Sequence, residues 1–199
     1  MNRLSRMWLA TCVALVAFAS AAYGFEIKAV VVADTNDRSI GQGVAVDAAA
    51  VAAHLERMAE VANIPLELTT LVGRDCNRDT IMQTVNGLRP GPQDVVFFYF
   101  SGHGQNHEDN WPEFTLGRGQ IVRFLEVHDV LKRSGARLTI TFSDCCNGLT
   151  FRSMQPAPLD LSEAMREWSP DPQEIRRLFG GVAGHVRGTS SQRGELSYV

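Results

Sequence analysis

Three short runs of consecutive apolar residues constrain the fold of this chain more than any other feature. They cover residues 26–33 (EIKAVVVA), 94–101 (DVVFFYFS) and 137–143 (RLTITFS), and a polar or glycine-rich break follows each of them at once. Strands that are apolar on both faces occur mainly in parallel sheets covered by helices on either side. The runs therefore predict a parallel sheet in the core of the protein.

Helical patterns lie between these runs. Between residues 44 and 62, apolar side chains recur at steps of three and four, which is typical of one buried helix face. This stripe consists of Val44, Ala48, Val51, Leu55, Met58 and Ala62. A second helix is expected to be capped by Asn77 or Asp79 and to end near Gly87, and a third to cover residues 121–134. Residues 66–71 and 184–190 are expected to be further strands, and 105–120 a polar loop. This alternation predicts the α/β class, with helices on both faces of the sheet.

Length and composition exclude a disordered, a collagen-like and a multi-span membrane protein. The chain has 199 residues, of which 45% are hydrophobic and 21% charged, so it fits about one ordinary globular domain. The formal net charge is −3, and no basic arm or arginine stripe is present. We therefore expect no nucleic-acid partner.

The first 24 residues have the pattern of a secretory signal peptide. Arg3 and Arg6 precede an apolar run over residues 7–19, and small residues at Ala22 and Gly24 suit a cleavage site before Phe25. A second cleavage site before Ala22 and a retained anchor are the alternatives. The run is short for a bilayer span, which needs about 20 apolar residues. We therefore expect residues 25–199 to form the domain, exported to the periplasm or the extracellular space without a stable membrane anchor.

The cysteines of the expected mature chain are odd in number. They are Cys76, Cys145 and Cys146, so at least one thiol stays unpaired unless it bonds to another chain. Cys76 is expected to be a small buried core residue. Cys145 and Cys146 are adjacent, and a strained disulfide between them is one alternative.

Two polar clusters follow two of the apolar runs. Residues 101–104 (SGHG) come directly after one run and residues 144–148 (DCCNG) after another. Ligands of open α/β sheets bind at the carboxyl ends of the strands, and successive strands are usually neighbours. We therefore expect His103 and one cysteine to lie close together. A thiolate with a nearby imidazole is the arrangement that nucleophilic thiol catalysis requires.

These motifs resemble those of a known family. Residues 98–104 (FYFSGHG) resemble the (Y/F)SGHG motif of the caspase-like cysteine peptidases, and residues 144–148 resemble the D-x-C motif of the metacaspase branch. The segment from Gly41 through Asp47 to Leu55 is similar to the first helix of that family. The resemblance implies a caspase-like three-layer sandwich, with a mostly parallel sheet between helices.

The resemblance also implies residue roles. Cys146 matches the nucleophile and His103 the general acid/base, while the backbone N–H groups of Gly104 and Cys146 match the oxyanion hole. Asp47 and Asp144 match carboxylates that line a pocket for Arg or Lys, and a guanidinium forks well onto carboxylates. The implied activity is that of an endopeptidase that cleaves a protein or peptide substrate after Arg or Lys through an acyl-enzyme. For Asp47, the alternative is an acid that merely favours a helix N-terminus.

Two metal sites are alternatives to thiol catalysis. Four side chains could supply zinc ligands: His103, His107, Cys145 and Cys146. Oxygen atoms for calcium are present on Asn106, Glu108, Asp109 and Asn110, although a solvated loop is the simpler interpretation. We expect no cofactor and no bound metal, and we leave open calcium activation, which some metacaspases show.

The C-terminal segment departs from the family pattern. Residues 185–199 (HVRGTSSQRGELSYV) resemble the fifth-strand region and the stretch after it, whereas family members normally continue into a last strand. We therefore expect that this C-terminal strand is missing and that an open sheet edge allows self-association. The alternative function is an inactive caspase-like binding or regulatory domain, or a fragment of a longer protein.

Overall fold

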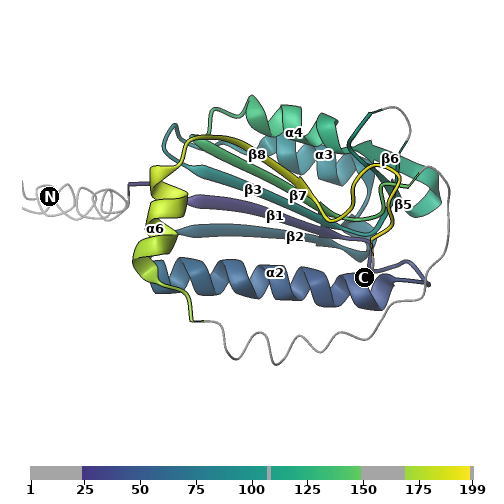
Figure 1. Ribbon diagram of the computed structural model, residues 1–199, viewed down its shortest axis with the longest axis horizontal. Coiled ribbons are helices and arrows are strands. Elements are labelled where there is room, and N and C mark those ends of the chain that lie inside the picture. Colours follow the sequence, from purple (N-terminus) through teal and green to yellow (C-terminus); the bar gives the residue numbers. More distant parts are fainter. Residues whose placement is uncertain (1–23, 107–108, 149–168, 198–199) are drawn as a thin grey trace, which may run out of the picture.

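A parallel sheet forms the centre of the protein (Figure 1). The computed structural model describes residues 24–106, 109–148 and 169–197. In this part of the chain the sheet has the strand order β2-β1-β3-β7-β8, and every neighbouring pair is parallel. The strands are β1 (Ile27–Ala33), β2 (Leu66–Val72), β3 (Val95–Ser101), β7 (Leu138–Asp144) and β8 (Gly184–Thr189). The predicted α/β class and the five predicted strands are confirmed.

Helices cover both faces of this sheet. Helices α2 (Gly41–Ala62) and α6 (Pro172–Gly181) belong to one hydrophobic cluster, and α3 (Arg78–Gly87) and α4 (Phe124–Lys132) belong to the other. Figure 1 shows α3 and α4 on the side of the sheet opposite to α2. The result is the expected three-layer sandwich. Asn77 caps α3, as predicted, because its side chain accepts a hydrogen bond from the Thr80 backbone N–H.

Strand β1 shows why the apolar runs are nearly continuous. Val30 and Val32 pack into the cluster under α3 and α4, whereas Ala29, Val31 and Ala33 pack under α2 and α6. Successive side chains of a strand point to opposite faces, so a strand covered on both sides needs apolar residues at every position. Full burial of each large side chain contributes about 1.5–3 kcal/mol to folding.

The segment between β3 and α4 differs from the prediction of a polar loop. It contains a small antiparallel sheet of β4 (His103–Gln105), β5 (Glu113–Leu116) and β6 (Gln120–Arg123). The turn η3 (Gly117–Gly119) joins β5 to β6, with φ of 62° at Arg118 and 71° at Gly119. Alternation along β5 buries Phe114, whose ring stacks on Phe100 at 4.1 Å. The polar composition of residues 105–120 does not reveal this packing, because it depends on contacts with distant parts of the chain.

The predicted helix over residues 121–134 was wrong at its start. Residues 120–123 pair with β5, and Val122 is fully buried in the core cluster. Helix α4 therefore begins at Phe124 rather than Ile121. Strand alternation and helical periodicity both place an apolar residue at 122, so the pattern alone could not separate the two.

The edges of the main sheet are β2 and β8 in the described part of the chain. The side chain of Val186 on β8 remains 40% exposed, so this edge strand is only lightly covered there. Residues 1–23 of the predicted leader, together with His107 and Glu108, lie outside the described residues. Within the described ranges, no helix has the length and apolarity needed to cross a bilayer.

The two-sided core leads to a prediction about stability. Leu55 on α2 is 1% exposed, whereas Leu178 on α6 is 54% exposed. Leu55→Ala should lower the free energy of unfolding by about 2–5 kcal/mol, because it removes buried methyl groups and leaves a cavity. Leu178→Ala is the matched control and should change it by less than about 0.5 kcal/mol. Urea denaturation measures both values, and equal losses would contradict the described packing.

Candidate active site

The two polar clusters meet because β3 and β7 are paired. Ser101, the last residue of β3, is the register partner of Asp144, the last residue of β7. Beyond the strands, the backbone N–H of Gly102 donates to the Asp144 carbonyl oxygen at 3.2 Å. His103 and Cys146 each follow this pair by two residues. The structure therefore brings the segments of His103 and Cys146 together at the carboxyl edge of the sheet.

Gly104 packs directly against the cysteine pair. A Cβ atom built at Gly104 would lie 2.2 Å from the carbonyl oxygen of Cys146 and 2.7 Å from Sγ of Cys145. No side chain fits there, because real Cβ contacts do not reach such distances. The absence of a side chain thus allows the backbone of Gly104 to approach the backbone of Cys146 closely.

The two adjacent cysteines occupy different environments. Cys145 is 1% exposed, and burial raises the pKa of its thiol well above the ordinary range. Cys146 is only partly buried, and its thiol donates to the carbonyl oxygen of Ser197 at 3.6 Å. All three described cysteines are free thiols, so the adjacent pair forms no disulfide here. Burial likewise raises the pKa of Cys76 to about 12, as expected for a core residue.

Asp47 and Asp144 interact electrostatically at the same edge of the sheet. The hydroxyl of Ser101 donates to Oδ2 of Asp47 at 2.8 Å, and the hydroxyl of Ser197 donates to Oδ1 of Asp144 at 2.7 Å. Burial raises the pKa of Asp47, the Ser101 hydrogen bond opposes this effect, and the charge of Asp144 adds to it. The helix-start explanation for Asp47 is not supported, because its carboxylate bonds to β3 and α2 has no acidic residue in its first turn. Ser101 and Ser197 were not predicted as site residues, although both lie in segments that resemble the family.

Two side chains from another loop lie beside the imidazole of His103. Its Nε2 lies 3.2 Å from the hydroxyl of Ser39 and 3.5 Å from Oδ2 of Asp37. Both residues belong to the loop between β1 and α2, which borders a hollow of about 350 Å³. The sequence reasoning missed them because they lie more than 60 residues before His103 in the chain.

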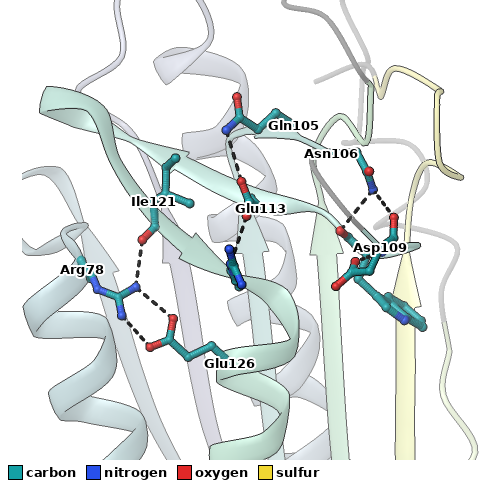
Figure 2. Close-up of polar contacts among 9 residues, drawn as sticks. Arg78, Gln105, Asn106, Asp109, Glu113, Ile121 and Glu126 are labelled. Atoms are coloured by element: carbon teal, nitrogen blue, oxygen red, sulfur yellow. Dashed lines mark hydrogen bonds and ion pairs between the residues drawn. The ribbon is translucent and has the colours of Figure 1, made fainter.

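A polar cluster braces the small sheet that carries His103 (Figure 2). Glu113 on β5 accepts hydrogen bonds from Gln105 on β4 at 3.3 Å and from Arg123 on β6 at 3.1 Å. These side chains tie the three strands together on one face. His103 and Gln105 are two apart on β4, so they project from the same face. The cluster thereby restrains the strand on which His103 lies.

The same cluster connects the small sheet to the helices. Arg78 on α3 forms a forked ion pair with Glu126 on α4, with Nη1 2.9 Å from Oε2, and also donates to the Ile121 carbonyl oxygen at 2.9 Å (Figure 2). The hollow bordered by this cluster measures about 790 Å³ and is larger than the one beside His103. Four of its charged side chains form the ion pairs Arg78–Glu126 and Arg123–Glu113. The fifth, Asp109, accepts a hydrogen bond from the Trp111 backbone N–H, so we assign the hollow a structural role.

The side chains considered above as alternative metal ligands form no metal-binding group in the described part of the chain, which does not include His107 and Glu108. No group of three or more His, Cys, Asp or Glu side chains there has the arrangement of a metal site. Asn106, one of the suggested calcium ligands, uses its amide N–H groups on the carbonyl oxygen of Asp109 and on Oδ1 of Asn147. It therefore holds the loop against the segment after β7.

Comparison with known proteins shows the family of this chain. The caspase domain family matches residues 27–194, so the chain belongs to the caspase domain family of cysteine peptidases. One solved structure with similarity is protein GSU0716 from Geobacter sulfurreducens, with 23% identity and a TM-score of 0.44. The match covers 63% of this chain and spans about half, 52%, of that one. The search of curated proteins found no match.

The close approach at Gly104 leads to a second prediction. Gly104→Ala should destabilise the fold by about 1–3 kcal/mol or more, because the new methyl group overlaps the Cys146 carbonyl. Gly87→Ala is the control, since a Cβ atom there meets nothing within 4 Å. Thermal unfolding of both variants measures the difference. An unchanged melting temperature for Gly104→Ala would refute the packing of β4 against Cys146.

Proposed function

We propose that the protein is a cysteine endopeptidase that cleaves after Arg or Lys, with Cys146 as nucleophile and His103 as general acid/base. The observation that carries the proposal is that two carboxylates lie at the carboxyl edge of the sheet: Asp47 binds Ser101, the register partner of Asp144, and Asp144 shares the contact of Ser197 with Cys146. Membership in the caspase domain family supports the reaction class. The acidic pair supports the side-chain preference.

The proposed reaction proceeds in two stages. The sulfur of Cys146 gives up its proton to His103 and attacks the carbonyl carbon of the scissile bond, and the charge that develops on oxygen is held by backbone N–H groups of Gly104 and Cys146. His103 then gives the proton to the leaving amine, and the C–N bond breaks to leave a thioester. In the second stage, His103 takes a proton from water, which hydrolyses the thioester and frees the thiol.

The exposure of the two thiols supports Cys146 rather than Cys145 as nucleophile. The thiolate is the reactive form, and a thiol sealed in an apolar core is inert. Cys145 is held in the core against Gly104, whereas Cys146 is partly exposed at the edge of the sheet. The substrate side chain would exchange the serine hydroxyls on Asp47 and Asp144 for the N–H groups of a guanidinium or ammonium. Hydrogen bonds between charged groups are stronger than the hydroxyl bonds they replace.

Hydrolysis of fluorogenic peptides with Arg or Asp before the reporter group tests the reaction. The full-length protein under reducing conditions should release the reporter from the arginyl peptide, and Cys146→Ala should lower turnover by about a thousand-fold or more. Cys145→Ala is the matched control for the nucleophile and should keep activity. If Cys145→Ala abolishes turnover while Cys146→Ala does not, the nucleophile assignment is wrong.

The acidic pair has its own variant in this assay. Asp144→Asn should reduce kcat/KM for the arginyl peptide by about ten- to hundred-fold, because a charge-assisted hydrogen bond of roughly 1.5–3 kcal/mol is weakened.

A well-folded protein that cleaves neither peptide favours the second candidate, a non-catalytic caspase-like binding domain. The observation in favour of that candidate is that Ser197 already contacts both the proposed nucleophile, Cys146, and the proposed substrate-binding carboxylate, Asp144.

We also propose that the chain is exported through its first 24 residues, on the basis of the two arginines and the apolar run in that segment. Mass spectrometry of the protein from a secreting host should find Phe25 at the N-terminus, because Ala22 and Gly24 are small enough for the peptidase that removes signal peptides. An N-terminus at Met1 would contradict the proposal. Ala22 at the N-terminus would support export with the second cleavage site.

A further inference from the structure

We propose that Asp37 is the positioning residue of His103, acting directly and through the hydroxyl of Ser39 to orient the imidazole and to balance its positive charge during proton transfer. The inference rests on the proposed function of His103 as acid/base. It adds to the cysteine–histidine pair a carboxylate that no sequence motif pointed to.

The fold delivers Asp37 to His103 through the pairing of β1 with β3. Ala33, the last residue of β1, is the register partner of Ser101, the last residue of β3. The backbone N–H of Asp34 donates to the Ser101 carbonyl oxygen at 3.2 Å, which keeps the two chain segments together beyond the strands. Asp37 and His103 follow within a few residues on either side of this bond.

The Asp37 carboxylate is itself held in place. Its Oδ1 accepts hydrogen bonds from the Ser39 backbone N–H at 2.7 Å, the Ser39 hydroxyl at 2.5 Å and the Ile40 backbone N–H at 3.1 Å. Its other oxygen, Oδ2, lies 3.5 Å from Nε2 of His103. One carboxylate oxygen therefore anchors the loop while the other faces the imidazole.

Asp37 carries its negative charge at neutral pH. Burial alone would raise the pKa of Asp37, but the hydrogen bonds from Ser39 and Ile40, together with nearby His103, outweigh it and hold the pKa below its ordinary value. Asp34 differs, because burial and the charge of Asp37 raise its pKa. Arg38 is the cationic residue that borders the same hollow. Of the two carboxylates, Asp37 is the one in direct contact with the ring.

Ser39 provides a second connection between the carboxylate and the ring. The Ser39 hydroxyl donates its hydrogen to Oδ1 of Asp37, so its oxygen is left to accept from Nε2 of His103 at 3.2 Å. With the hydrogen placed on Nε2, Nδ1 is the basic nitrogen available for the thiol. The proton of Cys146 then moves to Nδ1, and the resulting imidazolium lies beside the ionised carboxylate. Asp37 keeps its charge throughout and takes no proton.

The decisive variant is Asp37→Asn, which keeps the shape of the side chain and an oxygen for Ser39 and Ile40 but removes the charge. In the full-length protein, kcat for the arginyl peptide should fall by about tenfold or more, because the amide neither balances the imidazolium nor selects the same tautomer. KM should change by less than about twofold, since Asp47 and Asp144 are untouched. Asp129→Asn, which removes an exposed carboxylate on α4, is the matched control and should leave both constants unchanged.

A second measurement does not require turnover. Iodoacetamide alkylates a cysteine thiolate, and mass spectrometry reports the rate at Cys146 separately from Cys145. Asp37→Asn should slow alkylation of Cys146 several-fold at neutral pH, because the thiolate–imidazolium pair loses its third partner. This arm separates the two proposals, because a chain that cleaves no peptide would refute the peptidase function while the alkylation rate still reports on Asp37.

Unchanged kcat together with an unchanged alkylation rate in Asp37→Asn would overturn the proposal. A lower kcat together with a changed KM and a lower melting temperature would also overturn the proposal, because this result would mean that Asp37 only holds the structure of its loop. If Asp37→Asn does not fold, Ser39→Ala decides the question. A several-fold drop in kcat at constant KM in Ser39→Ala supports the connection through the hydroxyl, and no drop refutes it.

Discussion

Parallel pairing of β1, β3 and β7 in one register is the constraint on which the rest of the site depends. The pairing sets Ala33, Ser101 and Asp144 level with one another at the carboxyl edge. Three loops therefore start side by side, although more than 100 residues of chain separate the first from the last. The backbone hydrogen bonds between these strands, rather than their side chains, therefore determine which loop residues lie close together at this edge.

Beyond the strand ends, close packing decides how each group is presented. Gly104 allows β4 to lie against Cys145 and Cys146, so one thiol is sealed in the core while the other stays at the edge. The same contact continues into the small sheet, where Phe114 stacks on Phe100. The strand carrying His103 thus packs against Cys145 and Cys146 through Gly104, and its Gln105 donates a hydrogen bond to Glu113.

Charge is distributed unevenly around this edge. Asp47 and Asp144 interact with each other, whereas Asp34 and Asp37 interact with His103. Serine hydroxyls satisfy three of these four carboxylates, through Ser39, Ser101 and Ser197. A cation can replace a serine hydroxyl as the hydrogen-bond donor to one of these carboxylates, and its positive charge then compensates the negative charge. The arrangement places negative charge beside the His103 ring, where it stabilises an imidazolium.

The sequence by itself determined the α/β class, the five parallel strands and the two motifs whose segments meet at the edge of the sheet, because continuous apolar runs and the glycine-flanked histidine are local signals. The family resemblance also pointed to Asp47 and Asp144, although not to the serines that donate hydrogen bonds to them. Only the tertiary structure decided that residues 103–123 form a sheet, that Cys145 is buried while Cys146 is not, and that Asp37 and Ser39 lie beside His103. The physical reason is that these features arise from contacts between segments distant in the chain, and such contacts leave no periodic pattern in the residues that make them.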